Sequence, residues 1–155
     1  MAEHVLLVEQ AADWKSGFPR LPVVTARDYL THPDYSAHKQ LRVINLCRSY
    51  RYLSTGYYCS LLAEARGHKA IPNVRTIQEL SSRDIYSLAT EELDDLVQKL
   101  LGRRKNALQP TAYELTIFFG QCDVKELQPL ARQIFETFRS PILKVEFRLH
   151  GTWRI

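Results

Sequence analysis

The sequence is poor in cysteine, and the three cysteines that it has form no recognisable framework. Cys47, Cys59 and Cys122 are an odd number, and none belongs to a Cys-x-x-Cys pair. Domains stabilised by disulfides carry a denser, even set. The five histidines are scattered, so the close spacing of a structural zinc site is missing too. We therefore expect a reducing, cytoplasmic location and no metal site.

The sequence also lacks a long apolar run. A membrane-spanning helix needs about 20 consecutive apolar residues, and no stretch approaches that length. The first ten residues, MAEHVLLVEQ, have neither the basic start nor the extended apolar region of a secretory signal. Hydrophobic residues make up 45% of the chain and charged residues 25%, which is ordinary for a folded protein. We expect a globular chain without a membrane partner.

The sequence also lacks a large excess of one sign of charge. The net charge is +4 and the isoelectric point about 9.0, which suits an acidic or phosphate-bearing partner. No basic stripe or nucleic-acid motif accompanies this charge, so a nucleic-acid partner is not expected. Neither GxGxxG nor a P-loop occurs, so these residues do not indicate a nucleotide site.

What is present is a dense segment from residue 41 to residue 72. LRVINL (41–46) is typical of a buried strand, and a loop follows it. Ser54 or Thr55 can cap a helix that runs to Arg66, and Gly67 is suited to its end. KAI (69–71) predicts a second strand. Since a crossover of this length favours a parallel pair, the segment predicts a Rossmann-like unit. On the helix we expect an apolar stripe that faces the core: Tyr58, Leu61, Leu62 and Ala65.

The rest of the chain predicts an α/β fold in which helices flank an open mixed sheet. HVLLVE (4–9) and VV (23–24) read as strands, and a helix is expected from Thr90 to Gly102. A β-α-β-β lobe follows, and its strands could share a sheet with the first unit. We expect one domain over residues 1–155, with sub-lobes of about 1–102 and 111–155 that the basic segment RRKNALQP separates. The strand-like ending TWRI suggests a piece excised from a longer protein.

The loop between strand and helix is the candidate binding site. Loops after the carboxyl ends of strands commonly bind ligands in α/β sheets, and a helix N-terminus attracts anions. Arg48 and Arg51 could hold a carboxylate or phosphate, or could be solvated or paired with nearby acids. The predicted ligand-binding residues are Arg48, Arg51, Tyr52, Ser54, Thr55, Gly56 and Tyr57. Gly56 would let another group approach the backbone closely.

Cys47 and Cys59 are weaker candidates for a catalytic nucleophile. Cys59 lies in the first turns of the helix, where the helix dipole can lower a thiol pKa. His68 is the nearest histidine in sequence, but it follows the other end of the helix, about 15 Å away. It is therefore not expected to serve as the base for Cys59. Both thiols could equally be buried packing groups.

Residues 43–72, VINLCRSYRYLSTGYYCSLLAEARGHKAIP, resemble the N-terminal domain of RimK-like ATP-grasp ligases. The likeness extends more loosely from about Val23 to Ile155, through VVTARDYL, YELTIFFG and LKVEFRLHGTWRI. It implies a domain that precedes an ATP-grasp module, which joins a carboxylate to an amine with ATP. ATP and magnesium would bind in that adjoining module, in the same or a partner chain, and no cofactor is expected here.

The resemblance implies that this chain is an accessory or substrate-binding domain rather than a catalyst by itself. Its substrate would be a small carboxylate, an amino acid or a peptide. Two alternatives remain open at this point. One is an independent thiol amidase or peptidase that uses Cys47 or Cys59, and the other is a structural or dimerisation module.

Overall fold

The computed structural model describes residues 3–15, 21–102 and 112–155, and the chain divides into two compact units. The first unit is Met1–Ser81 and the second is Ser82–Ile155. The predicted division in the basic segment 103–110 lies outside the described residues. The observed division comes earlier in the chain because helix α5 (Arg83–Leu101) contacts α6 and β7 of the second unit.

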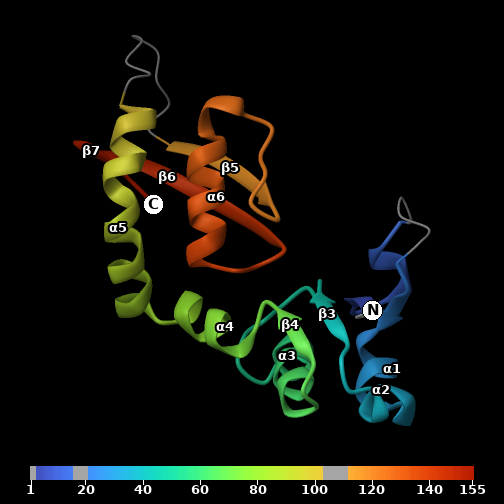
Figure 1. Cartoon of the computed structure of the whole chain (residues 1–155). Helices are drawn as coiled ribbons and strands as arrows, with labels where there is room; N and C mark the ends of the chain where they lie inside the picture. The colour runs from blue at the N-terminus through green and yellow to red at the C-terminus, as the bar shows by residue number, and fades with distance from the viewer. Residues whose placement is uncertain (1–2, 16–20, 103–111) are drawn as a thin grey trace. The chain divides into compact units, whose positions relative to one another are not determined.

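A parallel sheet of four strands, in the order β2-β1-β3-β4, forms the framework of the first unit; Figure 1 labels two of them, β3 and β4. Its strands are β1 His4–Val8, β2 Val23–Thr25, β3 Arg42–Asn45 and β4 Lys69–Ile71. β1 lies between β2 and β3, and β3 pairs with β4. The parallel pairing of β3 and β4 confirms the crossover that the sequence predicts.

Two helices of the first unit share one face of this sheet. The helical segments are η1 Ala11–Asp13, α1 Ala26–Thr31, α2 Pro33–Ala37, α3 Thr55–Ala65 and α4 Val74–Ser81. α1 and α3 contact each other, and their buried residues join Val5, Leu7 and Val43 of the sheet in one apolar cluster. Ser54 caps α3 as predicted, because its side chain accepts from the backbone N–H of Tyr57.

The predicted buried stripe of α3 is wrong. Its buried residues are Gly56, Cys59, Ser60 and Ala63. Tyr58 and Leu61 are 38% and 37% exposed, and they lie on the other side of the helix. The physical reason is close packing, because small side chains let the helix axis approach the sheet and leave no room for a tyrosine or leucine. A prediction from hydrophobicity alone therefore chose the wrong face of α3 as the buried one.

The segment after α3 is held by a buried polar network. The Tyr29 hydroxyl lies 2.8 Å from Nδ1 of His68, and the His68 Nε2–H donates to the carbonyl of His38 at 2.7 Å. Arg66 donates to the carbonyls of Tyr29 and Leu30, at 2.7 and 3.1 Å. Burial raises the pKa of Tyr29 to about 12. His68 is thus engaged in holding α1 and the turn after α3.

The second unit is an antiparallel sheet of three strands with helices against it, in the order β5-β6-β7. Its further elements are β5 Ala112–Phe118, η2 Lys125–Leu127, α6 Gln128–Thr137, β6 Ile142–His150 and β7 Thr152–Arg154. Phe147, Leu130 and Val97 are fully buried in its apolar cluster. Helix α5 begins at Arg83, seven residues before the predicted start at Thr90.

The predicted α/β class, with helices beside open sheets and a final β-α-β-β arrangement, is confirmed. The described strands are divided between two sheets, one parallel and one antiparallel, rather than joined in one. Each sheet also has its own apolar cluster of buried side chains.

Candidate functional site

The candidate site lies where the loops after β1 and β3 meet. From β1 the chain first goes to β2 on one side, and β3 later adds on the other side. In open α/β sheets this reversal opens a crevice at the carboxyl ends of the strands, where ligands commonly bind. The segment after β1 supplies Glu9, Gln10 and Asp13, and the segment after β3 begins the loop of residues 46–54.

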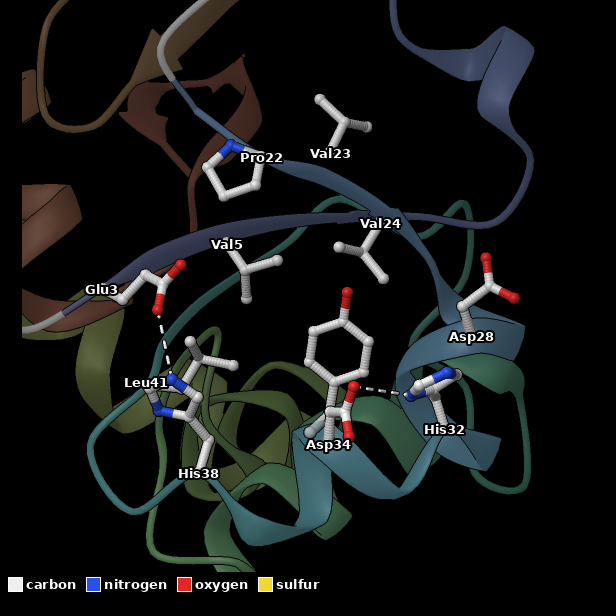
Figure 2. Close-up of a pocket in the computed structure, with 11 residues that line it drawn as sticks. Glu3, Val5, Pro22, Val23, Val24, Asp28, His32, Asp34, His38 and Leu41 are labelled. Carbon is white, nitrogen blue, oxygen red and sulfur yellow. Dashed lines mark ion pairs between the residues drawn. The ribbon is translucent and has the colours of Figure 1, made fainter.

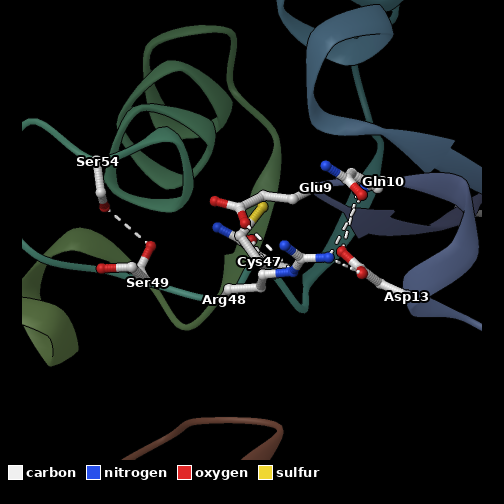
Figure 3. A network of polar contacts seen from close by, with 8 residues as sticks. Glu9, Gln10, Asp13, Cys47, Arg48, Ser49 and Ser54 are labelled. Carbon is white, nitrogen blue, oxygen red and sulfur yellow. Dashed lines mark hydrogen bonds and ion pairs between the residues drawn. The ribbon is translucent and has the colours of Figure 1, made fainter.

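Arg48 joins these two segments (Figure 3). Its guanidinium donates to the Asp13 carboxylate and to Gln10, and Nε lies 3.7 Å from a carboxylate oxygen of Glu9. The Arg48 side chain is 58% exposed, whereas Glu9 and Asp13 are 24% and 18% exposed. The hydrogen bond from Arg48 holds the pKa of the Asp13 carboxyl below its ordinary value.

The charge of Arg48 is therefore already balanced within the protein. Two carboxylates, Glu9 and Asp13, face one guanidinium, so this part of the site carries a net negative charge. Of the two possibilities that the sequence left open for Arg48, an anion site or pairing with nearby acids, the geometry shows the pairing. An anionic ligand at Arg48 would have to displace or outcompete Asp13. A positively charged group would instead meet the carboxylates directly.

The first turn of α3 is closed by the loop that leads into it. The Ser54 hydroxyl donates to the carbonyl of Ser49 at 2.8 Å while it caps the helix. A Cβ on Gly56 would lie 2.3 Å from the Ser49 carbonyl oxygen and 2.8 Å from Cβ of Cys47. Gly56 does permit a close approach, as predicted, but the group that approaches is the chain's own loop.

Asn45 fixes this loop from beneath. It is fully buried at the end of β3, and its side-chain amide donates to the carbonyl of Gly56 and to the hydroxyl of Ser60. The side-chain oxygen Oδ1 of Asn45 accepts a hydrogen bond from the backbone N–H of Cys47 at 3.1 Å. The Tyr50 hydroxyl donates to the backbone carbonyl of Asn45 at 2.6 Å. The backbone from Cys47 to Gly56 is thus tied to β3 at several points.

The outer side of the loop presents the remaining predicted residues. Arg51 is exposed, and its guanidinium makes no ion pair with any residue in the described ranges. Tyr52 is 77% exposed, and its ring meets Tyr57 edge-on at 5.4 Å between centroids. Leu53 has a φ of 66°, a left-handed conformation that costs a leucine about 1 kcal/mol. Thr55, the first residue of α3, is exposed as well, so Arg51, Tyr52, Thr55 and Tyr57 are the predicted residues that stay available to a ligand.

The two cysteines of the motif are buried. Cys47 is 5% exposed and Cys59 0%, and interaction between the two thiols raises the pKa of Cys47 and lowers that of Cys59. His68 is bound to Tyr29 and His38 beyond the other end of α3. For a thiol enzyme, these contacts provide neither an accessible nucleophile nor His68 as its base.

Sequence reasoning missed the residues that complete the site. Glu9, Gln10 and Asp13 were not singled out, although Glu9 ends the predicted strand HVLLVE and QAAD follows it directly. The signal that could have identified these residues is their position at the carboxyl end of a buried strand. That the segment meets Arg48 depends on β1 and β3 being neighbours, which no local pattern reveals.

Glu9 and Asp13 would repel a phosphate group beside Arg48, and the Ser49 carbonyl lies over the first turn of α3. Within the described ranges, no group of three or more His, Cys, Asp or Glu side chains could hold a metal ion. A search of the same residues for a helix long and apolar enough to span a bilayer found none.

The fold and site together define a Rossmann-like α/β unit with a cluster of polar contacts around Arg48 at the strand reversal. Comparison with known families is consistent with this class. A family model described as the RimK-like ATPgrasp N-terminal domain matches residues 26–155, so the chain belongs to that family. Comparison with curated proteins and with solved structures gave no match.

Proposed function

We propose that this chain is an accessory, substrate-binding domain of an ATP-dependent carboxylate–amine ligase. Membership of the RimK-like ATPgrasp N-terminal family supports this context. The adjoining ATP-grasp module, in the same chain or a partner chain, would bind ATP and magnesium and perform the chemistry. The domain described here would hold or orient a small substrate, such as an amino acid or a peptide.

The observation that carries this proposal is the mixed charge of the side chains at the strand reversal. Glu9 and Asp13 surround Arg48 at the strand reversal, while Arg51 lies exposed on the same loop. A zwitterion matches such a site, because its ammonium group can meet the carboxylates and its carboxylate can meet Arg51. The exposed ring of Tyr52 and the half-buried ring of Tyr57, which meets it edge-on, would contact the apolar part of the substrate.

This arrangement modifies the role that the sequence assigned to Arg48. As an ion-paired residue it would position Asp13 and Glu9 rather than grip an anion itself. Ser54 and Gly56 would act through the shape of the loop, since both are engaged with Ser49, whereas the exposed Thr55 could contact the substrate. Arg51 becomes the main proposed contact for a substrate carboxylate.

Titration of the isotope-labelled chain with glutamate and with a glutamate dipeptide would test the proposal. We expect amide shifts in residues 9–13 and 47–58, and weaker binding of N-acetylglutamate and of glutamate α-amide, each of which lacks one charge. Arg51→Ala and Asp13→Asn should each weaken binding about three- to tenfold. Arg132→Ala, an exposed arginine on α6, serves as the matched control.

Silence of residues 9–13 and 47–58 while other regions respond would overturn the site. If the full-length ligase keeps its activity in the Arg51→Ala and Asp13→Asn variants, the domain is a structural or dimerisation module instead. Iodoacetamide labelling against pH addresses the thiol alternative, because rapid labelling of Cys59 near neutral pH in the folded chain would favour it.

A further inference from the structure

A separate hollow lies beside the amino end of β1 (Figure 2). It has a volume of about 390 Å³ and lies beside β2, α1 and α2. Glu3, which precedes β1, lines it, whereas Glu9 of the candidate site follows β1. The two sites are distinct because none of the residues that line the hollow is Glu9, Gln10, Asp13 or a member of the loop 46–54.

The floor of this hollow is apolar. Val5, Val24 and Leu41 line it and are 2%, 9% and 3% exposed. Tyr35 also lines it, and its ring packs against the ring of Tyr29, with 5.7 Å between the ring centroids. Small-molecule sites commonly combine an apolar, aromatic wall with a few polar groups, in volumes of about 300–1,000 Å³. The hollow has this composition and falls near the lower end of that range.

The acidic side chains at its rim are Glu3, Asp28 and Asp34, and two histidines, His32 and His38, lie beside them. Glu3 pairs with His38 at 3.1 Å, and Asp34 pairs with His32 at 3.4 Å, so the two carboxylates belong to different His–acid pairs (Figure 2). Asp28 also lines the hollow and accepts from the Thr25 hydroxyl. None of the described lining residues is Lys or Arg, although the chain as a whole has a net charge of +4.

We propose that this hollow binds an organic cation, a primary ammonium or guanidinium group on an apolar stem. The stem would lie on Val5, Val24 and Leu41, and the cation would face Glu3 and Asp34. The Tyr35 ring offers a cation–π contact. An apolar floor favours an organic ligand over a bare ion, and within the described residues no cluster suited to a metal occurs here.

This inference does not depend on the ligase assignment, because it uses none of the residues of the candidate site. Its charges are at the surface: the side chains of Glu3 and Asp34 are 59% and 83% exposed. Salt screens such charges strongly, so binding is expected to weaken as ionic strength rises. The apolar contribution to binding should persist in salt.

Three probes of nearly the same shape test the proposal on the full chain: phenethylammonium, 2-phenylethanol and phenylacetate. We expect phenethylammonium to shift the amides of residues 22–41 in a saturable manner, and to bind more tightly than the neutral or the anionic probe. The double variant Glu3→Gln, Asp34→Asn should weaken phenethylammonium binding about fivefold or more. The matched control is Glu114→Gln, which removes an exposed carboxylate on β5.

Equal binding of the alcohol and the ammonium probe would overturn the proposal, as would a double variant that binds like the parent chain. Absence of any saturable response at millimolar probe, where even ~4 kcal/mol of binding would be visible, would overturn it too. Thermal unfolding of each variant checks that it remains folded. A variant that retains the parent's unfolding temperature but loses the response places the effect at the hollow.

Discussion

Gly56 shows at the scale of one residue how the candidate site is built. The φ of Gly56 does not require a glycine, because Gly56 is not among the described glycines with positive φ. Those are Gly67, Gly120 and Gly151. What demands glycine at position 56 is space: a methyl group there would meet the Ser49 carbonyl oxygen at 2.3 Å. Gly67 is the reverse case, with a φ of 77° and nothing within 4 Å of an added Cβ.

Gly56→Ala is expected to destabilise the chain by about 2 kcal/mol or more, because backbone has to move to accept the methyl group. Gly67→Ala should cost about 1 kcal/mol, through its left-handed conformation alone. Urea unfolding of both variants measures the difference. We further expect Gly56→Ala, but not Gly67→Ala, to shift the amides of residues 47–50. Equal costs and no loop response would show that the loop is not packed as described.

At the scale of an element, helix α3 reverses the usual relation between hydrophobicity and burial. The side facing the sheet carries Cys59, Ser60 and Ala63, while Tyr58 and Leu61 remain partly exposed. Buried polar groups on this side are satisfied, since the Ser60 hydroxyl donates to the carbonyl of Pro72 at 2.7 Å. A helix that packs this closely leaves its larger residues for contacts with a ligand or another domain.

Ala63→Leu tests this assignment of the buried face. Ala63 is 0% exposed, so the larger side chain should strain the packing and cost about 1–3 kcal/mol. Leu61→Ala should cost less than about 1 kcal/mol, because Leu61 is already 37% exposed. Chemical denaturation gives both values. The opposite ranking would restore the stripe that the hydrophobic pattern suggested.

At the scale of the whole molecule, each unit has an apolar cluster of its own. Val5, Leu7 and Val43 belong to the cluster of the first unit. Phe147 and Leu130 belong to that of the second. Separate clusters of this kind allow the units to unfold as separate cooperative regions.

Phe147→Ala should therefore lower the stability of the second unit by about 3–5 kcal/mol, because Phe147 is fully buried. Native-state hydrogen exchange would measure this loss at the amides of β5 and α6, with those of β1 and β3 as the internal comparison. Val43→Ala is the reciprocal variant in the first unit. Equal losses in both units would mean that they unfold together as one cooperative structure.

Local patterns in the sequence were sufficient for the strands, for the Ser54 cap and for the parallel pair around α3. Strands rich in branched apolar residues, a capping serine and a glycine at a helix end act over a few neighbouring positions, so their effects can be read directly. The family resemblance around residues 43–72 likewise needed no coordinates, and the match to residues 26–155 confirms it. The predicted ligand role of Arg51, Tyr52 and Tyr57 stays a prediction.

Tertiary structure alone decided the partners of Arg48 and the buried face of α3. The first depends on β1 lying beside β3, which brings Asp13 to a residue 35 positions away. The second depends on how closely a helix approaches a sheet, which is a matter of volume rather than hydrophobicity. Sequence by itself determined the strands, the Ser54 cap and the family; three-dimensional packing determined which charges meet, because contacts between distant segments leave no local signal.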